Sequence, residues 1–228
     1  MPNIKKPLEL GFLTVLFCCI NSCAFGQTNW TDWTEVIFGI DGSASGLLDG
    51  VAVSYTGQAL SNSVVDGSSN AWNPETSFTG GQVLQSPAEQ GDIITLDGGN
   101  VGLQTIEFSQ AIENPVIAIW SLGRLDDVAS FAFLQTPTFQ AGGPNSSFGG
   151  NPITVAGNIV SGLEGNGVVL FDGTFDSISF SSTPEFFYGF TVGTSATAVP
   201  EPSSATLLAT LMISVTAFKR RRSSHRTN

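Results

Sequence analysis

The central segment of this 228-residue chain, residues 27–199, offers carboxylates, hydroxyls, amides and aromatic rings for chemistry. It has 17 acidic residues and one base, Arg124, so its formal charge is −16, and it contains no Lys, His or Cys. One cation cannot neutralise a row of phosphates, so nucleic acid is excluded as a partner. Without His or Cys, a Ser-His-Asp triad, a Cys-His nucleophile and an ordinary zinc site are excluded as well. The remaining groups suit calcium or sugars, and a carboxylate pair is the catalytic scheme they most readily allow.

Asp126 and Asp127 are the candidate metal ligands, and they follow Arg124 after one residue. Calcium takes about six to eight oxygen ligands, and no segment has the EF-hand spacing. The other interpretation is that aspartates before glycines simply form turns. We predict no cofactor beyond a structural Ca²⁺ at Asp126 and Asp127. We expect Arg124 to pair with one of them or with a cross-strand carboxylate, rather than to clamp a ligand.

Trp72 is the candidate for stacking against a sugar, because it lies in the loop-like run Asn70–Pro74 between amide side chains. An aromatic face is apolar and matches the C–H face of a pyranose ring. Trp120 lies in an apolar run and is expected in the core. The alternative for Trp72 is that it caps the end of the domain.

Catalysis by glycoside hydrolysis would need two carboxyl groups about 5–10 Å apart. The candidates are Glu107, Glu113, Glu164 and Glu185. Their spacing does not pair them and no motif supports a reaction, so we predict no catalytic residue and a protein that is not an enzyme. The alternative is a carbohydrate-binding lectin or a carboxylate-dependent glycoside hydrolase.

Dense turn signals and short apolar runs predict an all-β domain over 27–198. Residues 27–199 hold 24 glycines, several in Asp-Gly pairs, and no window keeps a 3.6-residue period. Ten short strands at this spacing predict a single antiparallel β-sandwich, jelly-roll-like in type. The predicted strands are Trp33–Phe38, Val51–Thr56, Asp92–Leu96, Gly102–Ser109, Pro115–Ser121, Val128–Leu134, Ile153–Ala156, Gly167–Phe171, Phe175–Ser181 and Phe186–Val192.

Two local features refine this layout. Asp172-Gly173 favours a type I′ turn, which predicts that Val168–Phe171 and Phe175–Phe180 are adjacent antiparallel strands. The run Ala141–Pro152 is rich in Gly, Pro, Asn and Ser and is predicted to be a mobile loop. Valine should therefore cost much at Gly173 and little at Gly149.

Residues 1–26 have the pattern of a secretory signal peptide. Lys5 and Lys6 precede the apolar run Leu8–Ile20, and Ala24 and Gly26 are the small residues before the expected cleavage site. The alternatives are a retained anchor and lipidation at Cys23. All three cysteines lie in this segment, so we expect an exported domain without disulfides.

The C-terminal 199–228 has three parts: Val199-Pro200-Glu201-Pro202 within the motif 199–203, an apolar run 203–218, and a basic end 219–228. The apolar run would form a helix of roughly 24 Å, which spans only a thin bilayer. This order resembles the PEP-CTERM sorting signal of Gram-negative bacteria. The strand pattern of 31–193, including "GVAVSYTG", is similar to a recurrent β-sandwich ectodomain of such proteins. The alternative is a plain tail anchor.

The resemblance implies that exosortase, an integral-membrane cysteine transpeptidase, processes the tail near Pro200-Glu201-Pro202. It also implies a surface or matrix protein of bacteria that make exopolysaccharide and biofilm. The expected partners are exosortase, extracellular polysaccharide and, transiently through 203–218, the inner membrane. We therefore predict a structural or adhesive protein at the cell surface or in the extracellular matrix.

Overall fold

The computed structural model describes residues 26–67, 69–88, 91–99 and 102–196, which belong to one unit, Phe25–Val199. Their regular elements are β-strands and one short 3₁₀ helix, η1 (Glu75–Ser77), which confirms the all-β prediction. In these ranges no helix is long and apolar enough to cross a membrane. The predicted sorting motif Val199–Pro202 and the apolar runs at both ends lie outside the described residues.

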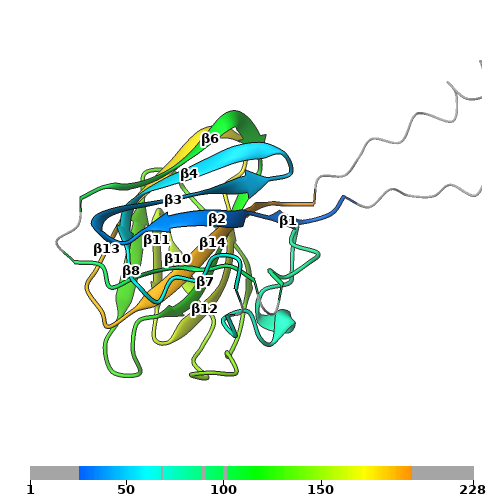
Figure 1. Ribbon diagram of the computed structural model, residues 1–228. Coiled ribbons are helices and arrows are strands. Elements are labelled where there is room, and N and C mark those ends of the chain that lie inside the picture. Colours follow the sequence, from blue (N-terminus) through cyan, green and yellow to red (C-terminus); the bar gives the residue numbers. More distant parts are fainter. Residues whose placement is uncertain (1–25, 68, 89–90, 100–101, 197–228) are drawn as a thin grey trace, which may run out of the picture. The chain divides into compact units, whose positions relative to one another are not determined.

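The strands form two antiparallel sheets (Figure 1). The small sheet has the order β1 (Asn29–Trp30), β14 (Tyr188–Thr194), β7 (Pro115–Leu122), β12 (Gly165–Leu170) and β9 (Thr138–Gly142), and β5 (Ile94–Leu96) also pairs with β14. The large sheet has the order β10 (Thr154–Ala156), β11 (Ile159–Gly162), β8 (Ala129–Phe133), β13 (Thr174–Ser182), β6 (Gln104–Glu113), β4 (Val51–Ala59), β3 (Gly39–Leu48) and β2 (Asp32–Ile37).

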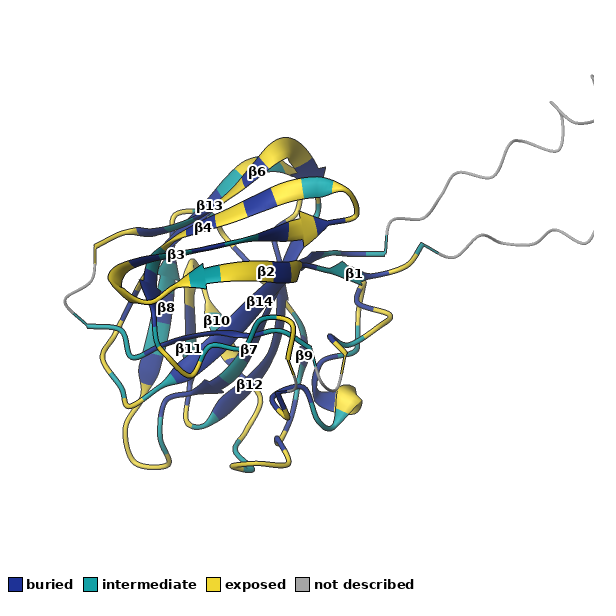
Figure 2. Cartoon of the chain, viewed as in Figure 1, coloured by how far each residue is buried: buried dark blue, intermediate teal, exposed yellow. Residues whose placement is uncertain are grey.

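Aromatic side chains from the two sheets meet in a shared core. The ring centroids of Tyr55 on β4 and Phe190 on β14 are 5.2 Å apart, as are those of Phe131 on β8 and Tyr188 on β14. Figure 2 shows the alternation of buried and exposed residues along β3 and β4. One face of the large sheet therefore packs on the small sheet, as in a β-sandwich, and its other face meets solvent.

Strand β7 is buried on both faces, as its unbroken apolar sequence predicts. Ile117 and Ile119 belong to the core between the sheets. Val116 and Ala118 belong to a second apolar cluster, which includes Trp72 and covers the outer face of the small sheet. The irregular segment between β4 and β5 supplies this cover and packs over β7 and β12.

The predicted hairpin at Asp172-Gly173 is wrong, because its two strands lie in different sheets. Strand β12 pairs with β7 and β9, whereas β13 pairs with β6 and β8. The backbone φ of Gly173 is 117°, but Asp172 is not among the residues with positive φ that a type I′ turn requires. The chain instead crosses from one sheet to the other at this point.

The connection from β6 to β7 also crosses between the two sheets, and its pairing with the β12–β13 connection explains the crossing at Gly173. The connection from β6 to β7 turns at Asn114, whose N–H donates to the Gly173 carbonyl at 2.6 Å, and the Gly173 N–H donates to Asn114 Oδ1 at 2.8 Å. Phe171, just before the crossing, is fully buried between the sheets. The two hydrogen-bonded connections, β6–β7 and β12–β13, thus pass together from one sheet to the other around the core. A two-residue hairpin could not make this crossing.

The segment Ala141–Pro152, predicted to be a mobile loop, begins inside a strand and is held by hydrogen bonds. Strand β9 includes Ala141, and Asn145 is buried and donates from Nδ2 to the carbonyl oxygens of Ala71 and Asn73. These bonds attach the loop to the segment between β4 and β5 that covers the small sheet. A buried amide group needs hydrogen-bond acceptors, and the two carbonyl oxygens provide them.

Candidate functional site

A pocket of about 380 Å³ opens where β7 ends, between the connection to β8 and the turns that precede β12 and β14. We call it the acidic–aromatic pocket. Its polar lining is Ser121, Arg124, Asp126, Glu164 and Glu185, and its apolar lining is Leu125, Phe148, Phe186 and Phe187. A smaller hollow of about 230 Å³ shares Phe148 and Phe187 with it and adds Trp120.

Aromatic rings form a wall that the two hollows share. The centroid of Trp120 lies 5.5 Å from that of Phe148 and 5.9 Å from that of Phe187. Phe148 is 47% exposed and Phe186 is 74% exposed. Large apolar rings gathered in water, beside polar groups, mark a ligand or partner surface more often than a simple solvent face.

Two glutamates bring carboxylates to the same pocket. Glu185 Oε2 accepts a 2.6 Å bond from the Gly123 N–H, and Glu164 Oε2 accepts a 2.6 Å bond from the Ser121 hydroxyl. The pKa of Glu185 is raised from 4.5 to about 7, mainly by burial and to a smaller extent by the negative charge of Glu164, against the lowering effect of the Gly123 N–H bond. A carboxyl group that titrates near neutral pH therefore lies in the same pocket lining as a second carboxyl group, that of Glu164.

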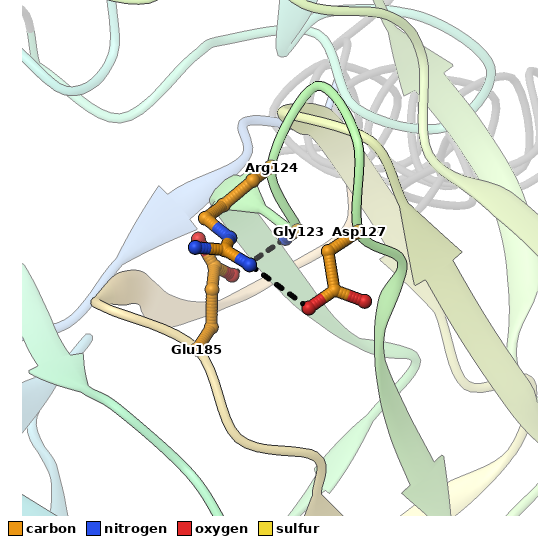
Figure 3. A network of polar contacts seen from close by, with 4 residues as sticks. All are labelled: Gly123, Arg124, Asp127 and Glu185. Carbon is orange, nitrogen blue, oxygen red and sulfur yellow. Dashed lines mark hydrogen bonds and ion pairs between the residues drawn. The ribbon is translucent and has the colours of Figure 1, made fainter.

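Arg124 lies beside the carboxylates of Asp127 and Glu185 (Figure 3). Its Nη2 lies 3.1 Å from Asp127 Oδ2, and its guanidinium carbon lies 4.8 Å from the centre of the Phe186 ring. The turn is closed by the backbone of the same residues, because the Arg124 N–H donates to the Asp127 carbonyl at 2.8 Å. The predicted pairing of Arg124 with a neighbouring aspartate is confirmed for Asp127.

Backbone strain is concentrated at this pocket. Ser121 and Glu164 have φ values of 56° and 50°, whereas the other non-glycine residues of positive φ in the described ranges are aspartates or asparagines. Asp and Asn tolerate this left-handed conformation, but Ser and Glu rarely adopt it, and the cost is of order 1–3 kcal/mol for each residue. The two strained residues are hydrogen-bonded to each other, and strain of this kind gathers at functional sites.

Asn166 holds the strained pair in place. The register of β12 against β7 shifts between Gly165 and Gly167, so Asn166 lies in a β-bulge. Its Oδ1 accepts the Ser121 N–H at 2.8 Å, and its Nδ2 donates to the Glu164 carbonyl at 2.8 Å. Bulges re-aim side chains and are frequent beside functional sites.

The stacking candidate Trp72 is not in the pocket, and its predicted exposure is wrong. It is 0% exposed, donates from Nε1 to the Asp92 carbonyl at 3.2 Å and packs edge-on against Phe78. The outer face of β7 needs an apolar cover, and Trp72 provides part of it. Trp120, predicted in the core, is instead half-buried and lines the smaller hollow that adjoins the pocket.

Sequence reasoning missed Phe186 and Phe187, which were assigned to a strand. Tyr188 begins β14, and the two phenylalanines precede it in a turn. A usable signal was present: three consecutive aromatic residues cannot all point to one face of a strand.

Asp126 and Asp127 were the predicted calcium ligands. In the structure Asp126 lines the pocket and Asp127 forms the ion pair with Arg124. In the described part of the chain, no three acidic, His or Cys side chains gather as a metal site. The structural Ca²⁺ therefore stays a prediction.

Glu185 should make stability depend on pH. Its pKa rises on folding from its ordinary value of 4.5 to about 7, mainly through burial, so the folded state binds more protons between these values. The free energy of unfolding is expected to fall as pH rises through this window. Glu185→Gln keeps an acceptor for the Gly123 N–H and should weaken this dependence in denaturation series from about pH 4.5 to about pH 8. An identical slope in both proteins would contradict the assignment.

Comparisons with protein-family models, with curated proteins and with solved structures each find no match to this chain.

Proposed function

We propose that this is an exported surface or matrix protein, sorted through the PEP-CTERM and exosortase route, whose sandwich domain adheres to extracellular polysaccharide. The route is supported by the three-part C-terminal pattern of 199–228 and the signal-like 1–26. The observation that carries the binding role is the partly exposed wall of Trp120, Phe148 and Phe187, of which Phe148 and Phe187 also line the acidic–aromatic pocket beside its polar groups.

The pocket chemistry suits a sugar. Ring faces pack on the C–H face of a pyranose, while Arg124 donates and Glu164 and Glu185 accept hydrogen bonds from hydroxyl groups. The strained, hydrogen-bonded Ser121 and Glu164 are fixed before a ligand arrives, which lowers the entropy cost of binding.

Trp120→Leu is the direct test of this role. Loss of the indole wall is expected to weaken binding to oligosaccharides at least tenfold, measured by titration calorimetry on ligands selected from a glycan array. Trp30→Leu is the matched control, because Trp30 is also half-buried but lines neither the acidic–aromatic pocket nor the adjoining hollow that Trp120 lines. Equal affinities of the two variants for the same sugar would reject the pocket as the binding site.

A second candidate function, glycoside hydrolysis, is favoured by the Glu164 and Glu185 pair. A protonated Glu185 would donate its proton to the leaving oxygen, while Glu164 would accept a proton from the attacking water. Incubation of the bound oligosaccharides decides between the two functions. New reducing ends that disappear in Glu185→Gln would indicate hydrolysis, and binding without cleavage would indicate adhesion.

A further inference from the structure

The solvent face of the large sheet carries rows of hydroxyl side chains that run across the strands. The pairing register places Ser45 on β3, Ser54 on β4, Glu107 on β6 and Ser177 on β13 side by side. A second row, two residues along, contains Ser43, Thr56, Thr105 and Ser179. The rows cross the four central strands β3, β4, β6 and β13.

A groove of about 510 Å³ lies over the first row. We call it the hydroxyl groove, and its side-chain lining includes Ser45, Ser54, Glu107, Ser109, Asp176 and Ser177. Phe108 also borders it but is buried, so the groove has no exposed aromatic ring in its lining. Its floor is therefore low, polar and formed by small side chains.

Folding alone does not call for these hydroxyls. The sheet is held by its inner face, where Val53, Tyr55 and Ile106 are buried in the core. On the solvent side, β-branched and aromatic residues would favour strands more than serine does. The hydroxyls of Ser45 and Ser54 make no side-chain hydrogen bond within the described ranges, so both remain free to donate and accept.

We infer that the hydroxyl groove is a second carbohydrate site, which binds a neutral polysaccharide chain laid across the strands. Each hydroxyl both donates and accepts, as sugar hydroxyls do, and the central Glu107 carboxylate can accept from two neighbouring sugar hydroxyls. The strands are about 4.8 Å apart, close to the length of one sugar residue in an extended chain, so successive sugars would meet successive strands.

The charge of the groove selects the class of polymer. Glu107 and Asp176 are its ionisable side chains, and its lining contains no Lys, Arg or His. Acidic polysaccharides and nucleic acids would therefore be repelled, whereas a neutral chain meets hydroxyl groups and small apolar surfaces without repulsion. This complementarity favours an uncharged glycan.

The groove and the acidic–aromatic pocket use different parts of the fold. The groove lies on β3, β4, β6 and β13 of the large sheet, whereas the pocket lies at the end of β7 and in the turns before β12 and β14. A domain with two glycan sites can bind two chains, or one chain twice, and the second event then gains from a high local concentration. The protein would thereby cross-link a polysaccharide matrix.

Two serine pairs on the same sheet give the test. Ser45→Val/Ser54→Val removes a cross-strand hydroxyl pair from the groove, and Ser130→Val/Ser161→Val removes an equivalent pair outside it, on β8 and β11. Valine favours strands, so both variants should keep the fold, which thermal melts will verify. We expect the groove variant to bind insoluble cellulose or chitin at least tenfold more weakly in depletion isotherms, and the outer pair to bind as the unaltered protein does.

Equal binding by the two valine variants would overturn the inference, and so would stronger retention on an acidic polymer such as alginate. Trp120→Leu in the same isotherms separates the two sites. It should lose small oligosaccharides but keep the component of polymer binding that Ser45→Val/Ser54→Val abolishes. If Trp120→Leu leaves all binding unchanged while the groove variant loses it, the pocket proposal fails and the groove stands.

Discussion

Replacing Asn166 by alanine is expected to lower the free energy of unfolding by about 2–5 kcal/mol. Asn166 is 1% exposed, and its side chain bonds to the Ser121 N–H and to the carbonyl oxygens of Glu164 and Gly149. Alanine would leave these backbone groups without their partner, at a cost of roughly 1–3 kcal/mol for each buried group. Such a loss is large against a domain stability of about 5–15 kcal/mol.

Asn158→Ala is the matched control for this variant. Asn158 is exposed and donates one hydrogen bond, from Nδ2 to the Phe133 carbonyl at 2.6 Å, so its loss should cost about 1 kcal/mol or less. Urea denaturation followed by tryptophan fluorescence measures both. Equal losses would show that Asn166 is no more than an ordinary loop amide, and the preformed pocket would lose its main support.

Alanine at Gly150 should destabilise the domain far more than alanine at Gly149. Both glycines have left-handed backbones, with φ of 84° and 71°, so both variants carry a strain of about 1–2 kcal/mol. A Cβ at Gly149 meets nothing within 4 Å, whereas a Cβ at Gly150 collides with the Glu164 carbonyl oxygen. The backbone at Glu164 would have to move, which we expect to raise the loss above about 3 kcal/mol.

The comparison of these two glycines isolates the collision, because the backbone strain cancels. Chemical denaturation gives the stability difference, and oligosaccharide binding reports whether Glu164 has moved from the pocket. If Gly150→Ala is as stable as Gly149→Ala, then the backbone of the turn before β12 shifts at little cost in free energy. That turn would then not fix the position of Glu164 in the pocket. The left-handed φ of Gly149 also means that valine there should cost more than the sequence indicated.

Local patterns in the sequence determined the class of fold and many of its strands. Alternation in Phe175–Ser181 and the unbroken apolar run of Pro115–Ser121 both correspond to strands, β13 and β7, because Ile178 and Phe180 face the core and β7 is buried on both faces. Strand β3 was missed, since Gly39–Leu48 is mostly Gly, Ser and Asp. Its pairing with β2 and β4 on both sides supplies the strand structure that its own residues do not favour.

Pairing between distant strands was decided by the tertiary structure alone. Asp172-Gly173 has the local chemistry of a tight hairpin, yet the β6–β7 connection at Asn114 provides a partner that draws the chain across the core. A turn motif indicates which local backbone conformations cost little free energy. The burial of Phe171 between the two sheets outweighs that local preference.

The candidate site divides in the same way. Composition alone supported the predictions that residues 27–199 neither bind nucleic acid nor use His- or Cys-based catalysis, because folding cannot supply a residue type that the segment lacks. The pairing of Glu164 with Glu185, and the exchange of roles between Trp72 and Trp120, required the structure. These residues are far apart in sequence, and whether a side chain becomes cover, core or pocket wall depends on which distant segment packs against it.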